Sequence, residues 1–368
     1  MHEYSDVTDR GVTESSLRVE RITVPYDEVL KTTCDILRDA LPKDYVSPQS
    51  IDGFDSPAML VAQSLVDGDA QGHPTHGIQR VIDYVEAIRS GRIDSYGKFT
   101  ITKQSPAHAV CRGGGNFGQV ASQLALQHAL DAIGNQPTFT VTCTDMYHAG
   151  RLEWYLRQAA RQGYGGFGML NVGGAGRAAP FPDGLESRYG TNPIAIAVPD
   201  GGDGVIVDFA TTAVTEGFVN VHRINEQALP TTGLLQTHDG QSTVNPHVLY
   251  DAPVGTLLPM AKHKGSGLAQ VIKMLVSQTT GRVLEENQKP KTNEIFLCLT
   301  NVAQFRDEAA AFAAVHETRD HIKSCRTKSG HPVLMPGEGG LERAQLAREN
   351  GIPLYRKTWE EVLALRDP

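Results

Sequence analysis

Apolar side chains recur at helical spacing through the first quarter of the chain. Residues 26–41 place apolar groups three and four positions apart, which predicts an amphipathic helix. Ser56 and Pro57 supply an N-cap and a first-turn proline for a second helix. The same periodicity over 78–88 predicts a third helix. We therefore expect a helical N-terminal part, preceded by a polar extension of roughly twenty residues.

Short β-branched runs then alternate with helical patterns for most of the remaining chain. Strands are predicted over residues 98–103, 107–112, 138–143, 168–172, 193–199, 205–208, 294–300 and 331–335. Helices are predicted over residues 119–133, 151–161, 264–278, 307–323, 341–350 and 359–365. This alternation predicts an α/β fold.

Composition and charge limit the partners that the protein can bind and indicate the compartment in which it works. The chain has 368 residues, of which 40% are hydrophobic, and a net charge of -8, which argues against nucleic acid or an anionic membrane as partner. No apolar run is long enough to span a bilayer, and the N-terminus lacks the apolar segment of a signal peptide. The five cysteines are scattered singly, which favours reduced thiols, a cytoplasmic location and no structural metal.

Two glycine patterns match G-x-G-x-x-G. Gly113, Gly115 and Gly118 follow a predicted strand and open a helix, the order that a Rossmann pyrophosphate loop requires. The second match, at 163–168, lies between a helix and a strand in the reverse order. The first match can equally be a tight turn that allows close helix packing, so both interpretations stay open.

The segment Thr75-His76-Gly77-Ile78-Gln79-Arg80 contains the residues best suited to catalysis and carboxylate binding. We expect a helix to start just after His76, so that Arg80 lies one turn on and on the same face. An arginine can hold a substrate carboxylate in a bidentate fork. A histidine can donate a proton to a carbonyl oxygen as hydride arrives, or accept it in reverse. The alternative is that Thr75 caps a helix while His76 and Arg80 are solvated.

Three further segments suit a ligand site. Residues 147–150 join a buried strand to a helix, where α/β sheets commonly bind ligands. Residues 190–193 form a turn before an apolar run, and Lys264 opens a helix at an end that suits phosphate. Without a ligand role, residues 147–150 would be a polar loop, residues 190–193 an ordinary turn and Lys264 a surface lysine.

These motifs, taken in order, resemble the type 2 malate/L-lactate dehydrogenase family, which includes ureidoglycolate, diketogulonate and sulfolactate dehydrogenases and cyclic ketimine reductases. The similarity runs from about residue 25 to the end, through THGIQR, VIDYVEAIRSGRI, GQVASQLALQHAL, YHAGRLEWYLRQAARQGYGGFGMLN, YGTNPIAIAVP, IVDFATT, HKGSGLA and PGEGG. The resemblance implies a non-Rossmann mixed-sheet fold that binds NADH or NADPH, and it favours the tight-turn interpretation of Gly113–Gly118. It also implies a homodimer with the active site near its interface.

We expect four parts: a flexible extension (1–24), an N-terminal helical substrate part (25–115), a cofactor-binding α/β domain (116–300) and a C-terminal segment (301–368) that returns to the first part. The resemblance assigns His76, with Thr75, to acid/base catalysis, and Arg80 and Thr191 to a small anionic substrate. The cofactor positions that it implies are His148, Gly150, Arg151, Leu152, Asp208, Ala210, Thr211, Lys264, Gly337 and Glu338.

Several positions depart from the family pattern. Gln71 stands where an arginine is usual, and Phe218 stands where a carboxylate often completes a relay with the histidine, with Glu216 two positions earlier. Gly339 replaces an arginine, which favours NADH because selection of a 2′-phosphate usually needs an extra cation. The implied function is hydride transfer between the cofactor and a small 2-hydroxy or 2-keto acid. A ketimine reductase, or a relative that has lost redox activity and acts as a binding protein or non-redox enzyme, are the alternatives.

Overall fold

The computed structural model describes residues 20–366 except 46, 48, 174–175 and 282–291. Its N-terminal part is a bundle in which α1 (Tyr26–Ala40) packs against α2 (Pro57–Ala70) and α3 (Arg80–Arg89). Ser56 caps α2 by accepting a hydrogen bond from Met59 N at 3.2 Å, as its sequence predicts. Leucine, valine and isoleucine side chains from all three helices share one apolar core.

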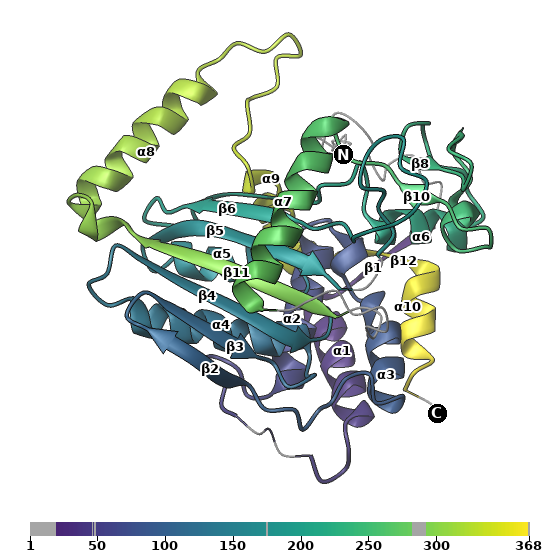
Figure 1. The fold of residues 1–368 in the computed structure, drawn as a ribbon, viewed down its shortest axis with the longest axis horizontal. Coiled ribbons are helices and arrows are strands. Elements are labelled where there is room, and N and C mark those ends of the chain that lie inside the picture. Colours follow the sequence, from purple (N-terminus) through teal and green to yellow (C-terminus); the bar gives the residue numbers. More distant parts are fainter. Residues whose placement is uncertain (1–19, 46, 48, 174–175, 282–291, 367–368) are drawn as a thin grey trace.

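Elements from the C-terminus complete this bundle. Strand β12 (Ile352–Tyr355) pairs antiparallel with β1 (Arg21–Val24), and α9 (Glu338–Asn350) contacts α2. Helix α10 (Arg356–Leu363) contacts α3 beside them (Figure 1). Residues 21–24 are therefore an ordered strand rather than part of a flexible extension, because the backbone of β12 satisfies their hydrogen bonds. The rest of the expected extension, residues 1–19, lies outside the described residues.

The centre of the molecule is a seven-stranded mixed sheet with the order β2-β3-β4-β11-β5-β6-β7. Its strands are β2 (Thr100–Ser105), β3 (His108–Arg112), β4 (Thr138–Met146), β11 (Asn293–Asn301), β5 (Tyr164–Val172), β6 (Ile194–Val198) and β7 (Val205–Phe209). Strands β3 and β4 run parallel, and every other neighbouring pair is antiparallel. A doubly wound Rossmann sheet is parallel, so the predicted non-Rossmann mixed-sheet α/β fold is confirmed.

Helices cover both faces of the sheet. Helices α4 (Gly118–Ile133) and α5 (Leu152–Ala160) pack on one face around a large apolar core, and α7 (His263–Thr280) crosses the other (Figure 1). The face under α7 is only partly covered, since Ile196 and Val198 of β6 keep 45% and 42% of their surface exposed.

The Gly113–Gly118 turn is filled by the protein itself. A Cβ on Gly118 would lie 2.3 Å from Tyr147 O, and one on Gly113 would lie 2.7 Å from the Ala121 side chain. The buried amide of Asn116 donates to Gly97 O at 2.9 Å and closes the turn. These glycines therefore allow α4 to pack closely on the loop that follows β4, as the tight-turn interpretation expects.

A small three-stranded sheet, β10-β8-β9, lies beside the main sheet with α6 (Glu216–Ile224). Its strands are β8 (Leu235–Gln236), β9 (Ser242–Thr243) and β10 (Thr256–Leu257). Helix α6 contacts the short 3-10 helix η2 (Pro74–His76), so this small unit meets the segment around His76.

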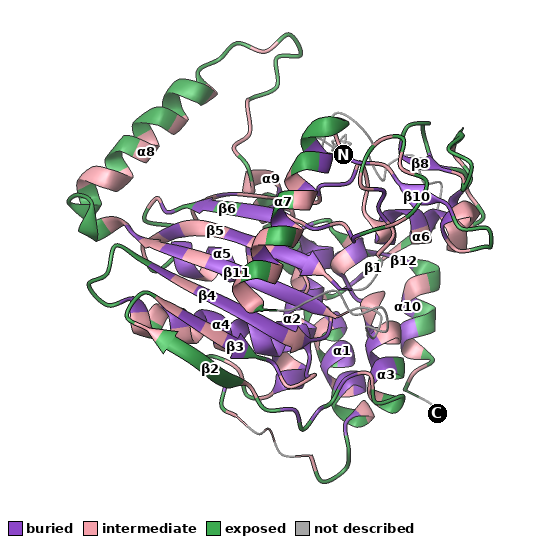
Figure 2. Ribbon diagram, in the orientation of Figure 1, coloured by how far each residue is buried: buried purple, intermediate pink, exposed green. Residues whose placement is uncertain are grey.

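Helix α8 (Glu308–Lys323) projects from the body and contains no buried residue (Figure 2). The segment that follows runs back to α9 without regular structure, so the strand predicted over 331–335 is wrong. Residues 328–332 are exposed, and no strand among the described residues pairs with 331–335, so these residues gain no ladder hydrogen bonds that would order them as a strand. Within the described ranges, no helix has the length and apolar character needed to cross a membrane.

Candidate active site

The His76 segment is held by close backbone packing against the end of α2. The buried carboxylate of Asp69 accepts a hydrogen bond from Ile78 N at 2.7 Å. A Cβ on Gly77 would lie 2.1 Å from that carboxylate, and one on Gly68 would lie 2.8 Å from His76 O. Both glycines are therefore needed to let the turn and the helix approach.

The relation between His76 and Arg80 differs from the prediction. His76 ends the 3-10 helix η2, Gly77 takes an extended conformation, and Arg80 begins α3, so the two side chains do not share one helix face. Instead, Arg80 Nε donates to Thr75 O at 2.8 Å. The tertiary fold brings the predicted pair together by this contact rather than by helical periodicity.

His76 has two aromatic and polar neighbours. Its Nδ1 lies 3.1 Å from the Thr75 hydroxyl, and its ring stacks on that of His148 at a centroid distance of 5.7 Å. Desolvation, together with the charges of His148, Arg80, Arg151 and His73, lowers the pKa of His76 well below its ordinary value. The imidazole is therefore neutral at neutral pH in the absence of substrate.

A buried tyrosine orients His148. The Tyr84 hydroxyl lies 2.6 Å from His148 Nδ1 and accepts a hydrogen bond from Gln119 Nε2 at 2.8 Å. Burial raises the pKa of Tyr84, so its hydroxyl keeps its proton. The hydroxyl proton is available for donation to His148 Nδ1, and this arrangement corresponds to the His148 tautomer that is protonated on Nε2.

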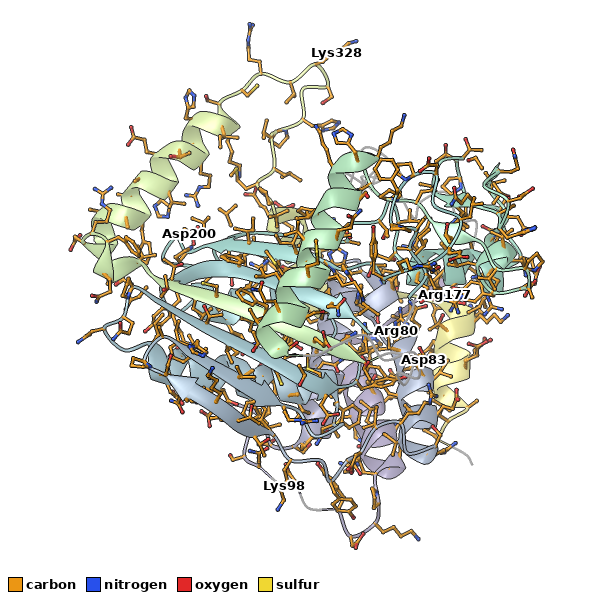
Figure 3. All side chains as sticks on the ribbon, in the orientation of Figure 1. Arg80, Asp83, Lys98, Arg177, Asp200 and Lys328 are labelled. Atoms are coloured by element: carbon orange, nitrogen blue, oxygen red, sulfur yellow. The ribbon has the colours of Figure 1, made fainter. Side chains whose placement is uncertain are left out.

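Arg80 meets carboxylates on two sides. Its Nη1 lies 3.3 Å from Asp83 Oδ2, and its Nη2 lies 3.9 Å from Glu216 Oε2. Figure 3 shows Arg80 and Asp83 in the region where the helical bundle meets the small sheet. A Cβ on Gly217 would lie 2.9 Å from Arg80 Nη2, so the start of α6 presses directly on the guanidinium. The contact between Arg80 Nη2 and Glu216 Oε2 is the longer of the two, so it is the one that a ligand carboxylate could replace.

Phe218, which takes the place of a relay carboxylate, points into an apolar cluster of the small unit. It is 6% exposed and packs on His222 at a centroid distance of 4.4 Å. Glu216 faces Arg80 and Tyr250. Of Thr75 and Glu216, Thr75 is the residue whose side chain reaches His76 Nδ1.

Arg151, one of the predicted cofactor residues after β4, belongs to a buried ion-pair network. Arg151 bonds Asp67 at 2.5 Å and Glu153 at 2.9 Å, and Glu153 also pairs with Arg157. Although burial opposes it, the two arginines hold the pKa of Glu153 below its ordinary value. This network fastens the loop of His148 and Gly150 to helix α2.

Asp208, at the end of β7, closes the same network. Its Oδ2 accepts a hydrogen bond from Glu153 N at 2.9 Å and so caps the first turn of α5, whose first residue is Leu152. Burial raises the pKa of Asp208 to about 6. A carboxylate already occupies this helix N-terminus, so a phosphate has no place there.

Thr191, Ala210, Thr211 and Lys264 form a second group. Thr191 O accepts hydrogen bonds from the backbone N and hydroxyl of Thr211, at 2.9 and 2.8 Å. Thr211 O in turn accepts from Met260 N at 3.0 Å, which brings the start of α7 and the exposed Lys264 beside the end of β7. Ala210 lies between Phe209 and Thr211 in this turn.

Gly337 and Glu338 lie at the other end of β7. Pro336 O accepts from Ile206 N at 3.3 Å, and Gly337 has φ +85°, a backbone region that favours glycine. Glu338 accepts from Met335 N at 2.9 Å and pairs with Lys323. These contacts direct the Glu338 carboxylate to its own turn and to the end of α8.

Two of the positions that depart from the family pattern, Gln71 and Gly339, both lie near Arg343. Gln71 donates to Asp67 Oδ2 at 2.8 Å, and its backbone oxygen accepts from Arg343 Nε at 2.8 Å. A Cβ on Gly339 would lie 3.5 Å from Arg343 Nη1. Arg343, on the next turn of α9, is thus the cation beside residue 339, and its Nε is bonded to Gln71 O.

The residues present fit an extended dinucleotide. Gly337, Asp208, Thr211 and Lys264 lie in this order beside the edge strand β7, from the Pro336–Ile206 contact at one end to the Thr211–Met260 contact at the other. The exposed ammonium of Lys264 at the start of α7 suits a phosphate, whereas Asp208 and Glu338 already accept hydrogen bonds from Glu153 N and Met335 N. These residues could hold an extended dinucleotide without a Rossmann loop.

The profile of the malate/L-lactate dehydrogenase family matches residues 53–363. The chain belongs to the malate/L-lactate dehydrogenase family. Hydroxycarboxylate dehydrogenase B of Escherichia coli O157:H7 is 28% identical over 83% of this chain and 86% of its own length. Malate dehydrogenase of Pyrococcus abyssi is 29% identical over 83% and 86%. The sulfolactate dehydrogenase structure from Methanocaldococcus jannaschii has a TM-score of 0.78 at 26% identity, over 94% and 96% of the two chains.

Membership of the malate/L-lactate dehydrogenase family makes this protein an oxidoreductase of the hydroxy-acid dehydrogenase class. Sequence reasoning missed the groups that support its predicted site residues, namely Asp67, Asp69, Tyr84, Gln119 and Tyr250. Tyr84 follows Arg80 by four positions and lies one turn on in α3, which was the available signal. Asp67 and Asp69 lie just before His76 in the sequence, whereas Gln119 and Tyr250 reach the site only through the fold.

Proposed function

We propose that the protein transfers a hydride between NADH and a small 2-hydroxy or 2-keto acid. The observation that carries this proposal is the cluster of His76, Thr75, His148 and Arg80, in which a neutral imidazole lies close to a cation. Of the donors on Arg80, Nε is bonded to Thr75 O, so a substrate carboxylate would use the Nη1 and Nη2 fork. Thr191 is proposed as a further substrate contact.

The proposed roles follow from these contacts. The bound nicotinamide supplies or accepts the hydride. His76 takes the hydroxyl proton of the acid during oxidation, or returns it to the carbonyl oxygen during reduction. The Thr75 hydroxyl holds Nδ1 and leaves Nε2 for the substrate, while Arg80 fixes the carboxylate and so orients the reacting carbon.

The cofactor is proposed to lie along β7, with Lys264 near a phosphate and Asp208 near a ribose. His148, Gly150, Arg151, Leu152, Ala210, Thr211, Gly337 and Glu338 would shape this strip. We favour NADH because Gly339 adds no cation of its own and Arg343, the nearby arginine, donates through Nε to Gln71 O. Fluorescence titration with NADH and NADPH tests this choice, and tighter binding of NADPH would contradict it.

A homodimer is proposed as the working form. Apolar side chains remain exposed on β6 and on the outer face of α7, where Val271 and Met274 are 53% and 62% exposed. A patch of this kind is typical of an association surface. Sedimentation at micromolar concentration should give twice the 39.9 kDa monomer mass. A cytoplasmic setting is proposed because all five cysteines are unpaired.

The decisive experiment is an NADH oxidation assay with a panel of 2-keto and cyclic 2-imino acids. We expect turnover of at least one 2-keto acid. His76→Ala should lower kcat by about a hundred- to ten-thousandfold, while binding of NADH persists. Turnover of imino acids alone would identify a ketimine reductase. Wild-type kcat in His76→Ala would refute the proposed acid/base role, and no turnover with any acid would refute the activity itself.

A further inference from the structure

The carboxylate of Glu216 stands beside the proposed carboxylate clamp and is held in place from two directions. Its Oε2 lies 3.9 Å from Arg80 Nη2, and its Oε1 accepts a hydrogen bond from the Tyr250 hydroxyl at 2.7 Å. The side chain of Glu216 is 30% exposed, against 15% for Arg80. Glu216 is therefore a fixed neighbour of Arg80 rather than a mobile surface group.

Tyr250 is itself fixed by cations. The guanidinium carbons of Arg177 and Arg223 lie over its ring, at 4.7 and 4.5 Å from the centroid. Arg177 bonds Leu249 O, and Arg223 bonds Asn220 Oδ1 at 2.9 Å. The arrangement links the loop of Arg177, labelled near Arg80 in Figure 3, to the start of α6.

We propose that Glu216 is a specificity-determining residue, which disfavours a second negative charge on the substrate and favours a group that donates a hydrogen bond, such as an amide or a protonated imine. This inference rests on the proposed function, because it takes Arg80 as the group that holds the substrate carboxylate. It goes beyond that function by naming the charge class of the substrate.

Glu216 would disfavour a second negative charge on the substrate because of the charges around the Arg80 guanidinium. Arg80 already faces two carboxylates, Asp83 at 3.3 Å and Glu216 at 3.9 Å. A monoanionic acid adds a third negative charge, and its carboxylate can displace the longer contact. A dianionic acid brings a fourth charge into the same partly desolvated space, where like charges repel strongly. A donor group on the substrate would instead bond Glu216 Oε2.

Oxamate and oxalate provide a matched pair of probes. They have nearly the same size, but oxamate carries one negative charge and an amide donor, whereas oxalate carries two negative charges. With the full chain saturated with NADH, calorimetric titration should show tighter binding of oxamate. In Glu216→Gln, the ratio of the two dissociation constants should move toward oxalate by about tenfold, or 1.4 kcal/mol.

Two further variants make the test specific. Glu226→Gln removes the same charge from an exposed residue that faces His247 at 3.4 Å, and should leave the ratio unchanged. Tyr250→Phe removes only the hydroxyl that holds Oε1, and should move the ratio in the same direction by a smaller factor. This second variant also covers the case in which Glu216→Gln does not fold.

The outcomes separate the inference from the proposed function. Tighter binding of oxalate by the wild type, or an equal ratio in wild type and Glu216→Gln, would overturn the role of Glu216 and leave the clamp intact. Binding of neither probe to any variant would show that Arg80 does not hold a carboxylate, and both proposals would fall together.

Discussion

Two arginines near the candidate site differ in how fully their charge is neutralised. Arg151 has a side chain only 6% exposed and contacts Asp67 at 2.5 Å and Glu153 at 2.9 Å. Arg80 is 15% exposed, and its two carboxylate contacts are longer, at 3.3 and 3.9 Å. A guanidinium with short buried partners on both sides stabilises the fold, whereas one with looser partners can exchange them for a ligand. The difference supports a mainly structural role for Arg151 and the proposed binding role for Arg80.

The largest expected effect is on stability. Arg151→Met should lower the free energy of unfolding by about 3–5 kcal/mol, because it leaves a buried charge of the network without its partner. Chemical denaturation measures this loss. Arg80→Met is the matched control and should cost much less, since Asp83 and Glu216 are 35% and 30% exposed and can be hydrated. Equal losses in the two variants would erase the distinction between these arginines.

The next effect concerns binding of the acid. Arg80→Lys keeps the charge but loses the planar fork, and a charge-assisted hydrogen bond contributes about 1.5–3 kcal/mol. We expect kcat/KM to fall by about ten- to a hundredfold, mainly through a higher KM. Steady-state kinetics on the active acid measures this change. An unaltered KM in Arg80→Lys would mean that the acid is held elsewhere.

A smaller effect should follow from Tyr84→Phe. The variant removes the hydroxyl that lies 2.6 Å from His148 Nδ1, a bond worth about 0.5–1.5 kcal/mol, so activity should fall by a few-fold. The specific readout is the ¹⁵N NMR spectrum of His148, whose population protonated on Nε2 should decrease. Tyr147→Phe is the control, because that hydroxyl faces Arg92. An unchanged His148 tautomer in Tyr84→Phe would show that the tyrosine only fills space.

The smallest expected effect is a shift in pH dependence. Because the pKa of His76 is lowered, its neutral form predominates at pH 7 and serves oxidation. Reduction needs the protonated form, so its kcat/KM should keep rising as the pH falls below about 6.5, the ordinary value. Oxidation should decline only at pH values below this. Arg80→Met removes one of the cations that lower the pKa, so both limbs should move to higher pH. A reduction rate that levels off above pH 6.5 would contradict this assignment.

The sequence predicted most elements because their signals are local. Ser56 and Pro57 start α2 as expected, and the β-branched run after Thr138 forms β4. The strand predicted over residues 331–335 is wrong because a strand needs a neighbour, and no described strand lies beside these residues. Residues 21–24 were predicted to be part of a flexible extension but form a strand, because their partner β12 lies more than three hundred residues away in the sequence. Local composition reports neither the absence nor the presence of a distant partner.

The candidate site divides in the same way. The sequence alone identified Thr75, His76 and Arg80 as one chemical unit, because a histidine, a hydroxyl and an arginine lie within six positions. Only the tertiary structure decided how they meet, through Gly77 packed on Asp69 and Arg80 bonded to Thr75 O. It alone placed Glu216 against Arg80, Tyr84 against His148 and Asp208 on the first turn of α5. Charge and hydrogen bonding act over a few ångströms of space, and residues far apart in sequence reach that range only when the chain has folded.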